Sequence, residues 1–422
     1  MDLWRRRRSA WPCLFFCLEA FSVELNTLAS DASLALLGST GSIGESTLAV
    51  ARKIENLSIF ALTANTNAAR LLAQCLEFNP RYAVLVDSAG ADQLAKALRA
   101  AGCNTELLVG PEALDQVAAD AEVDMVMAAI VGAAGLASTL AAATAGKRLL
   151  LANKEALVMT GDILMDAARH NGSTLLPIDS EHNAIFQCLP TVKDGISASQ
   201  FTFVEKIVLT ASGGPFLDTP LDQFASITPA QACAHPVWSM GSKISVDSAT
   251  MMNKGLEFIE ACFLFGLAAD QVEVIIHPQS VIHSMVHYSD GSVLAQMASP
   301  DMRVPIAHCI AWPQRITTEA PRLDLAAGQS LEFREPDLAR FRCLELGMEA
   351  ARVRGTAPAL LNAANEEAVE AFLAGRLSFS RIAAVNADVM AQIPCESASS
   401  LDIIYDADSR ARALAKTLIN NS

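Results

Sequence analysis

Two short segments of this chain hold several side chains that could bind a metal ion beside a phosphate. Asp179 and Glu181 lie in the run Asp-Ser-Glu-His, and Glu257 ends the run Ser-Ala-Thr-Met-Met-Asn-Lys-Gly-Leu-Glu at 248–257. If residues 179–181 are extended, the two-residue period of a strand places both carboxylates on one face. Oxygen ligands favour Mg²⁺ or Mn²⁺ over Zn²⁺, which prefers nitrogen and sulfur. The pattern therefore indicates a site for a hard divalent cation; an acidic turn and a solvated Glu257 are the alternative.

A glycine-rich run at 38–44 is the second feature with a chemical implication. It reads Gly-Ser-Thr-Gly-Ser-Ile-Gly and joins the apolar run 34–37 to the helix-like segment 45–53. Glycines in a strand-to-helix turn let the backbone approach a pyrophosphate at the N-terminus of the helix. The spacing is GxxGxxG rather than GxGxxG, so an ordinary structural turn is the alternative.

The end of the second predicted strand bears on which nicotinamide cofactor this turn would bind. NAD-specific sites usually place an acidic residue there, on the ribose hydroxyl. Residues 61–67 read Ala-Leu-Thr-Ala-Asn-Thr-Asn and contain no acid, which favours NADP. Arg70, one turn further on, could reach a 2′-phosphate or could be an exposed helix residue.

These segments lie in a repeating pattern of apolar runs and helical stretches, which is typical of a parallel sheet. The predicted strands are 34–37, 57–63, 82–86, 125–129, 148–152 and 174–178. Asn153-Lys154-Glu155 and Asp179-Ser180-Glu181 each follow one of these strands. Parallel-sheet enzymes bind ligands at the carboxyl ends of strands, so both segments are expected at one site.

The rest of the chain has a different pattern of predicted helices and strands. Residues 201–311 are expected to form strands with few long helices: the strands are 206–210, 272–276, 280–288 and 292–297, with a hairpin turn at 289–291. A Pro- and Gly-punctuated stretch at 312–336 reads as a linker, and helices are expected at 338–351, 359–373, 380–392 and 406–418, with Gly375 as a cap. We therefore expect an α/β protein. Its parts are an extension (1–30), a Rossmann-like dinucleotide-binding domain (31–178), a central α+β catalytic domain (179–311), a linker (312–337) and a C-terminal helical domain (338–422).

Composition limits the class of protein. A chain of 422 residues is too long for one core, and 52% hydrophobic against 18% charged residues indicates a well-buried globular protein. The net charge of -15 disfavours binding to nucleic acid or to an anionic membrane. The ten cysteines form no CxxC pair, so we expect a reducing compartment, no disulfides and a cytoplasmic location.

Two segments could be mistaken for membrane signals. Four arginines at 5–8 precede an apolar stretch at 11–18, but Glu19 interrupts it and no clean cleavage site follows. A mis-assigned start codon or a disordered extension is expected instead. The uncharged run 125–146 is long enough to span a bilayer, but Gly132 and Gly135 divide it into a strand (125–130), a loop and a helix (136–145).

Seven segments together resemble one enzyme family. They are GSTGSIG, LLANKE, DSEHNAIFQ, SGGPF, HPVWSMG, ISVDSATMMNKGLE and HPQSVIHSMV. From about Leu34 to the C-terminus the chain resembles the 1-deoxy-D-xylulose 5-phosphate reductoisomerases of the non-mevalonate isoprenoid pathway. The resemblance implies conversion of 1-deoxy-D-xylulose 5-phosphate to 2-C-methyl-D-erythritol 4-phosphate with NADPH and Mg²⁺ or Mn²⁺. It also implies a homodimer, with the sheet-rich middle region as the interface.

The resemblance also implies roles for individual residues. The metal ligands would be Asp179, Glu181 and Glu257, and Lys154 would join them as a catalytic residue that stabilises charge or donates a proton. Substrate would contact Lys154, Ser180, Glu181, Ser212, His235, Trp238, Ser248, Asn253, Lys254 and Glu257, with Ser212, Ser248, Asn253 and Lys254 on the phosphate. The cofactor would contact Thr40, Gly41, Ser42, Ile43, Asn67, Asn153, Glu155 and Gly241.

Some residues allow more than one interpretation. The segment 235–240, with Trp238 and Met240, reads as a lid that excludes water, whereas an ordinary core position is the alternative for Trp238. His277 and His283 are left out of the site because a lone strand histidine is more often structural. Many family members carry a basic residue where this chain has Thr66, which weakens the case for NADP over NAD.

Two other functions would use the same fold. A semialdehyde dehydrogenase needs a nucleophilic cysteine in a defined loop. Cys188 lies in a predicted helix and Cys233 beside the predicted lid, and neither is in a convincing setting. A catalytically inactive regulator is the other alternative. Three clustered acids without a cation would be costly to hold together, which argues against it.

Overall fold

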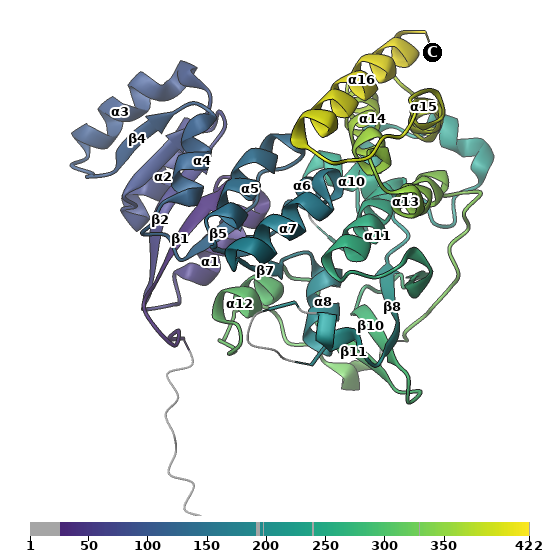
Figure 1. Cartoon of the computed structure of the whole chain (residues 1–422), viewed down its shortest axis with the longest axis horizontal. Helices are drawn as coiled ribbons and strands as arrows, with labels where there is room; N and C mark the ends of the chain where they lie inside the picture. Colours follow the sequence, from purple (N-terminus) through teal and green to yellow (C-terminus); the bar gives the residue numbers. More distant parts are fainter. Residues whose placement is uncertain (1–25, 191–194, 197, 239, 329, 422) are drawn as a thin grey trace, which may run out of the picture.

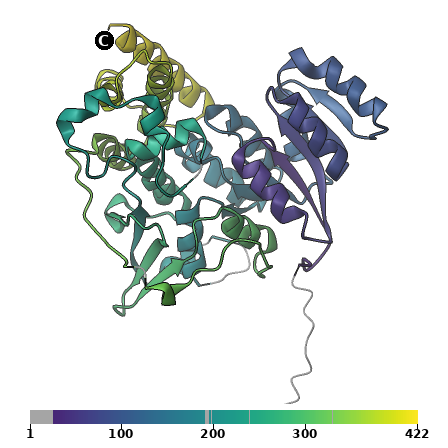
Figure 2. The ribbon, with the colours of Figure 1, turned by 180° about the vertical axis from the view of Figure 1, so that it is seen from behind.

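The computed structural model describes residues 26–190, 195–196, 198–238, 240–328 and 330–421. Figure 1 shows the parallel sheet and the helices that flank it at the left of the molecule. The smaller sheet lies at the lower right, and the last helices lie above it. Figure 2 shows the same three parts from behind. The predicted signal-like segment at 5–18 lies outside the described residues. At the start of the described chain, the Leu28 backbone N–H donates to Asn56 Oδ1 at 2.8 Å.

The N-terminal part is a seven-stranded parallel sheet, as the alternating apolar runs predict. Its strands are β1 (Ala32–Leu37), β2 (Leu57–Ala64), β3 (Tyr82–Leu85), β4 (Glu106–Val109), β5 (Met125–Ala128), β6 (Arg148–Leu151) and β7 (Thr174–Pro177), in the order β4-β3-β2-β1-β5-β6-β7. The prediction missed β4. Glu106 and Val109 of this edge strand are exposed, so it lacks the apolar run that identifies the other six.

Successive side chains of β1 point to opposite faces, and each face is covered by helices. The helices are α1 (Ser42–Ala51), α2 (Ala68–Phe78), α3 (Ala91–Ala100), α4 (Glu112–Ala119), α5 (Leu136–Thr144), α6 (Lys154–Thr160) and α7 (Asp162–Asn171). Leu34 and Leu36 belong to a core with α1, α2 and α3. Ala35 and Leu37 belong to a second core with α4, α5 and α7. The strand order reverses at β1 and β5, which is where α/β sheets of this kind bind ligands.

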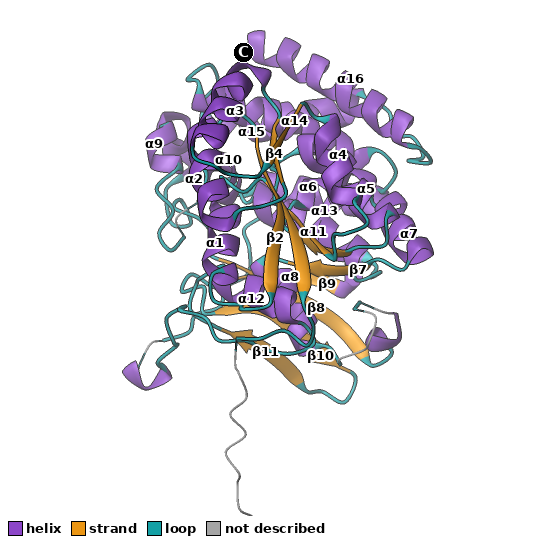
Figure 3. Cartoon of the chain, turned by 90° about the vertical axis from the view of Figure 1, so that its left-hand side faces the viewer, coloured by secondary structure: helices purple, strands orange, loops and turns teal. Residues whose placement is uncertain are grey.

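In its described residues, the central part contains a four-stranded sheet and five α-helices. The sheet has the order β11-β10-β8-β9 and comprises β8 (Val204–Ala211), β9 (Val272–Ile276), β10 (Ile282–Tyr288) and β11 (Val293–Met297). The helices are α8 (Ser180–Cys188), α9 (Pro229–Ala232), α10 (Ser242–Ala249), α11 (Met252–Leu264) and α12 (Arg303–Ala311). In Figure 3, β10 and β11 of the smaller sheet lie below β2 and β4 of the parallel sheet.

The expectation of few long helices in this region agrees with the structure, but the sequence analysis did not place α11. Helix α11 has 13 residues and is buried along almost its whole length. The buried charged residues Lys254, Glu257 and Glu260 interrupt its apolar residues, so the sequence shows no clear division into an apolar face and a solvated face. Helix α12 also departs from the expected pattern, because Ile306 and Ile310 pack into the core that contains β1 and α1.

Four helices end the chain, as predicted. They are α13 (Arg342–Val353), α14 (Ala357–Leu373), α15 (Phe379–Gln392) and α16 (Leu401–Asn420). Helix α16 begins earlier than the predicted 406 because Ser400 caps it, accepting the N–H of Ile403 at 3.4 Å. Gly375 follows α14 with φ 71°, which suits the predicted cap.

Helix α11 is held tightly against α13 by two glycines. A Cβ on Gly255 would lie 3.3 Å from the Cα of Gly347, so the two backbones are in direct contact. Any side chain at either position would push the helices apart. The close contact of Gly255 with Gly347 therefore fixes the position of α11, the helix that carries Glu257.

Two further expectations concern the linker and the uncharged run. Residues 312–336 include a short 3-10 turn at Leu325–Ala327, and Arg334 pairs with Ile276 of β9 through a backbone bridge. The run 125–146 forms β5 and α5, as expected. In the described part of the chain, no helix is long and apolar enough to cross a membrane.

Candidate active site

A cavity of about 540 Å³ lies at the carboxyl ends of the central parallel strands, between the two sheets. Most of the predicted site residues line it: Ser42, Ile43, Asn153, Lys154, Glu155, Asp179, Ser180, Glu181, Ser212, His235, Trp238, Gly241, Ser248, Asn253, Lys254 and Glu257. Thr40 and Gly41 directly precede Ser42 in the turn before α1. Asn67 caps α2, where its Oδ1 accepts the N–H of Arg70 at 3.1 Å.

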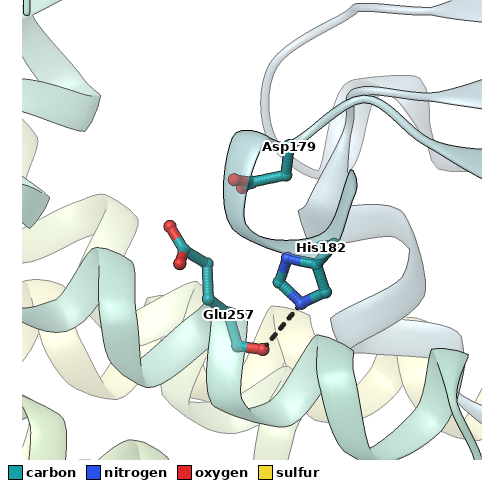
Figure 4. Close-up of side chains that lie close together, drawn as sticks. All are labelled: Asp179, His182 and Glu257. Carbon is teal, nitrogen blue, oxygen red and sulfur yellow. Dashed lines mark hydrogen bonds between the residues drawn. The ribbon is translucent and has the colours of Figure 1, made fainter. Parts of the chain in front are cut away.

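The acidic residues are brought together by the starts of two helices. Asp179 is the N-cap of α8 and Glu181 lies in its first turn, so the proposed extended pairing of these residues is wrong. The helix instead places Asp179 and His182, three residues apart, on one side. Ligand atoms of Asp179, His182 and Glu257 all lie within 4.8 Å of one another (Figure 4). His182 was not among the predicted ligands, although its helical spacing from Asp179 is a signal for it.

Two buried lysines neutralise part of this acidic group. Lys154 Nζ pairs with Asp179 and lies 3.0 Å from Glu257 Oε1. Lys254 Nζ pairs with Glu257 and lies 2.7 Å from Glu181 Oε1. Burial alone would lower the pKa of each lysine, but the facing carboxylates raise both above their ordinary values. Both ammonium groups are therefore charged.

The acids still outnumber the lysines. Burial raises the pKa of Glu181 to about 8, and the Glu257 carboxylate adds to this rise. Glu260 of α11 is fully buried; neither of its carboxylate oxygens has a hydrogen-bond partner among the described residues, and the closest cation candidate is His182 Nε2 at 3.6 Å. Burial and Asp179 hold the pKa of Glu260 well above its usual value.

Asp179 behaves differently from Glu181 and Glu260. Burial would raise its pKa, but the Lys154 ammonium outweighs this effect and lowers it. Four carboxyl groups thus share two ammonium groups in a buried space. The raised pKa values keep Glu181 and Glu260 protonated at pH 7 without a cation. A divalent cation would favour their ionised forms, and carboxylate oxygens are the ligands that Mg²⁺ and Mn²⁺ prefer. The residues present fit such an ion.

The predicted phosphate-binding residues border the same acids. Ser212 Oγ lies 3.0 Å from His235 Nε2 and accepts the N–H of Gly214 at 3.2 Å. Asn253 Nδ2 donates to Glu257 Oε1 at 2.5 Å, and its Oδ1 accepts from Lys154 Nζ at 3.0 Å. Hydroxyl, amide and ammonium donors therefore converge next to the acidic group.

The segment around Trp238 forms part of the cavity wall. His235 Nδ1 accepts the N–H groups of Val237 and Trp238 at 3.1 and 2.9 Å, which closes a tight turn. Trp238 is half-buried and its ring centroid lies 6.1 Å from that of His283. Residue 239 of the predicted lid lies outside the described residues. The indole lines the cavity rather than the hydrophobic core.

The two histidines left out of the predicted site differ from each other. His283 lines the cavity, and burial lowers its pKa to about 4, so its ring is neutral at pH 7. His277 lies elsewhere: its Nδ1 is 2.9 Å from the Glu332 carbonyl oxygen, and its Nε2 accepts the N–H of Val281 at 3.2 Å.

The glycine-rich turn forms the opposite end of the cavity. Gly41 is the N-cap of α1 and makes no side-chain cap, and Ser42 and Ile43 line the cavity behind it. A Cβ on Gly44 would lie 2.5 Å from the Gly38 carbonyl oxygen, so only glycine fits there. An uncapped helix N-terminus reached by bare backbone suits a pyrophosphate. The turn fits a dinucleotide.

Two basic residues, Arg70 and Lys243, were either ambiguous in the sequence or not identified from it. Arg70 is paired with Glu45, with Nε–Oε1 and Nη2–Oε2 distances of 2.5 and 2.6 Å. Lys243, which the prediction did not include, lines the cavity and lies 2.8 Å from Glu155 Oε1. No local motif marks Lys243: Asp247, four residues on, makes an ordinary helix pair with it, and Glu155 is 88 residues away.

Comparison with known proteins settles the family. Three family models match: "1-deoxy-D-xylulose 5-phosphate reductoisomerase" over 34–161, "1-deoxy-D-xylulose 5-phosphate reductoisomerase C-terminal domain" over 175–265, and "DXP reductoisomerase C-terminal domain" over 297–414. The reductoisomerase of Pseudomonas fluorescens is 56% identical over 388 residues, which covers 92% of this chain and 98% of the relative. That of Ralstonia pickettii is 57% identical over 388 residues, with 92% and 97% covered. The chain belongs to the 1-deoxy-D-xylulose 5-phosphate reductoisomerase family.

Solved structures of reductoisomerases share the fold. One, crystallised with NADPH, fosmidomycin and magnesium, has a TM-score of 0.88 and 48% identity, with 92% of this chain and 98% of that chain covered. The enzyme of Zymomonas mobilis, in complex with NADPH, has a TM-score of 0.85 and 45% identity, with 92% and 99% covered. The predicted resemblance and the predicted α/β fold class are therefore confirmed.

The cysteines do not support the dehydrogenase alternative. None of the described residues that line the cavity is a cysteine. Burial raises the pKa of Cys188 to about 11, so its thiol is a poor nucleophile at neutral pH. The eight described cysteines are free.

Proposed function

We infer that the protein converts 1-deoxy-D-xylulose 5-phosphate to 2-C-methyl-D-erythritol 4-phosphate with NADPH and Mg²⁺ or Mn²⁺. One observation carries this inference: in a chain of this family, the acidic group and the glycine-rich turn open into the same cavity. The reaction needs that arrangement, because the carbon skeleton must rearrange beside the cation and the resulting aldehyde must then meet the cofactor.

The acidic group would hold the cation. Asp179, Glu181 and Glu257 are the proposed ligands, and the position of His182 beside Asp179 and Glu257 adds it to the group. When bound, the cation polarises the carbonyl and hydroxyl oxygens of the substrate, and NADPH supplies the hydride for the reduction. Lys154 is charged and faces Asp179 and Glu257, so it can stabilise negative charge on a substrate oxygen or donate a proton to it.

The substrate would be held at its phosphate and covered at its reacting end. The hydroxyl, amide and ammonium donors of Ser212, Ser248, Asn253 and Lys254 suit a phosphate. A phosphate fixed at one end orients the reacting carbons at the other. Ser180 and His235 would contact the substrate, and Trp238 would exclude water from it.

The cofactor would lie between the glycine-rich turn and the start of α6. The proposed contacts are Thr40, Gly41, Ser42, Ile43, Asn67, Asn153, Glu155 and Gly241. The absence of an acid at 61–67 supports NADPH over NADH. Because Glu45 already engages Arg70, that side chain is not counted among the contacts.

Three broader expectations belong to the same proposal. The domains would span 31–178, 179–311 and 338–422, with an extension at 1–30 and a linker at 312–337. The protein would be cytoplasmic. It would form a homodimer through the smaller sheet, whose edge strand β11 exposes Val293 and Leu294. A monomer by light scattering would contradict the dimer.

The assay is loss of NADPH absorbance on addition of 1-deoxy-D-xylulose 5-phosphate, with Mg²⁺, with Mn²⁺ and with a chelator. Oxidation that depends on the cation is the expected result. A parallel series with NADH measures cofactor choice in a chain that carries Thr66. No oxidation with either cation, from protein shown to be folded by circular dichroism, would favour the inactive regulator instead.

A further inference from the structure

A chain of buried polar side chains leads from the cavity to the C-terminal helices. At the cavity, Lys243 Nζ lies 2.8 Å from Glu155 Oε1 and 2.9 Å from Asp247 Oδ2. Behind it, Asn365 Nδ2 of α14 donates to Asp247 Oδ1 at 2.7 Å. Asn386 Nδ2 of α15 donates in turn to Asn365 Oδ1 at 3.2 Å. We refer to these five residues as the Lys243 network.

The Lys243 network is buried and charged. Asp247 is 1% exposed, and Asn365 and Asn386 are fully buried, so each depends on the next for its hydrogen bonds. Burial would lower the pKa of Lys243, but Asp247 and Glu155 outweigh it and raise the pKa above its ordinary value. Burial would raise the pKa of Glu155, but Lys243 lowers it. Both members of the pair at the cavity are therefore ionised.

Glu155 stands at the junction of the two binding regions. It lies in the first turn of α6, two residues after Asn153, which caps that helix. Its neighbour Lys154 points to Asp179 and Glu257, whereas Glu155 turns to Lys243 on α10. Without the ammonium, the carboxylates of Glu155 and Asp247 would face each other with no cation between them, and like charges in a buried space repel.

We propose that Lys243 is a positioning residue for the cofactor: it holds the Glu155 carboxylate at the cavity wall, and Asn365 and Asn386 hold it in turn through Asp247. The proposal rests on the proposed function, in which Glu155 contacts NADPH. The C-terminal helices thereby help to set cofactor affinity, although α14 and α15 supply no residue to the cavity lining in the described chain.

A structural tie without a positioning role would give the same contacts, so the test must separate the two. The measured quantity is the Kd of the full-length protein for NADPH, from quenching of tryptophan fluorescence. We expect Lys243→Met and Glu155→Gln each to raise this Kd about ten-fold or more. The Kd of the double variant should exceed the higher of the two single-variant Kd values by no more than about two-fold, because Lys243 acts through Glu155.

The controls isolate the position from the charge. Lys243→Arg keeps a cation between the two acids and should restore the Kd to within about three-fold of the parent. Lys206→Met removes an ammonium that lies 2.8 Å from Glu273 Oε1, on the smaller sheet and outside the cavity, and should leave the Kd unchanged. Asn365→Leu, further from the cavity, should raise the Kd by about three-fold while the KM for 1-deoxy-D-xylulose 5-phosphate stays the same.

Three results would overturn the proposal. The first is an unchanged Kd for NADPH in Lys243→Met, and the second is a Kd in the double variant that equals the product of the two single effects. The third is a lower melting temperature in Asn365→Leu with no change in its Kd for NADPH. If Lys243→Met does not fold, Asn365→Leu decides, and an unchanged Kd in that variant has the same meaning. Failure of the proposed function is distinct from these results, because the parent protein itself would then neither bind nor oxidise NADPH.

Discussion

The two ends of the cavity recognise charge in different ways. The acidic end is made of side chains from α8 and α11, with Asp179 and Glu257 far apart in sequence, and two lysines offset only part of its charge. The glycine-rich end is made of backbone from one continuous turn, 38–44, at the N-terminus of α1. One end crowds carboxyl groups whose ionised forms a cation would stabilise, whereas the other has bare backbone for a ligand to approach.

The two ends of the cavity are therefore unfavourable to build for different reasons. Holding buried carboxyl groups together is unfavourable, as the raised pKa values of Glu181 and Glu260 indicate. The glycine-rich end instead requires that no side chain occupy the turn. The acidic end should therefore respond to cations and to pH, and the glycine-rich end to side-chain volume.

The largest expected effect comes from neutralising the central acid. Glu257→Gln removes a proposed ligand and the partner of both Lys154 and Lys254. We expect kcat to fall by roughly 10³-fold or more, while the Kd for NADPH changes by less than about two-fold. Steady-state assays and fluorescence titration measure the two quantities. Glu273→Gln, at an exposed position of β9, is the matched control and should change neither. Unchanged turnover in Glu257→Gln would refute its role as a ligand.

The second effect should fall on the other end alone. A methyl group on Gly44 would meet the backbone carbonyl of Gly38 at 2.5 Å, so the turn must shift. We expect Gly44→Ala to raise the Kd for NADPH about ten-fold and to lower the free energy of unfolding by about 1–3 kcal/mol. Mg²⁺ should still raise the melting temperature, because the acidic end is intact.

Gly90→Ala is the comparison for this substitution. A Cβ at Gly90 would lie 3.3 Å from the Ala68 Cβ, and its φ of -97° is accessible to alanine. We expect this variant to bind NADPH as the parent protein does. If Gly44→Ala abolished the response to Mg²⁺ as well, the two ends would not be independent.

The same contrast explains what the sequence could predict. The glycine-rich turn was placed correctly because its strand, turn and helix are contiguous in the chain. At Asp179 the residue types were identified but the geometry was wrong. An acid followed by serine and a second acid is compatible with an extended strand and with the N-cap of a helix, and only the packing of α8 decides between them.

Residues that act through distant partners left no signal. Lys243 belongs to no recognisable motif until α10, α6 and α14 are packed together. His182 could have been predicted, because it lies three positions after Asp179 on what proved to be a helix. Helix α11 was missed because its buried charged residues, Lys254, Glu257 and Glu260, interrupt the apolar pattern that marks a helix.

The smallest expected effect is a pH dependence confined to the acidic end. Glu181 has a pKa of about 8 in the folded protein, against 4.5 for an ordinary glutamate, because of burial and the Glu257 carboxylate. Over this interval the folded protein retains a proton that the unfolded chain releases. Glu181 therefore contributes stability that is fully present below about pH 4.5 and is lost as the pH rises through about 8.

Urea unfolding of the metal-free protein between about pH 5 and pH 8 tests this sign. In Glu181→Gln the loss cannot occur, so the variant's free energy of unfolding, relative to that of the parent, should rise with pH. Using the difference removes the contribution of His182, whose pKa is lowered to about 4 and whose effect on stability runs the other way. Saturating Mg²⁺ should abolish the rise, because a bound cation stabilises the ionised carboxylate. Parallel pH profiles without the cation would mean that Glu181 is ionised throughout, and the acidic end would then differ from the glycine-rich end in composition but not in its response to pH.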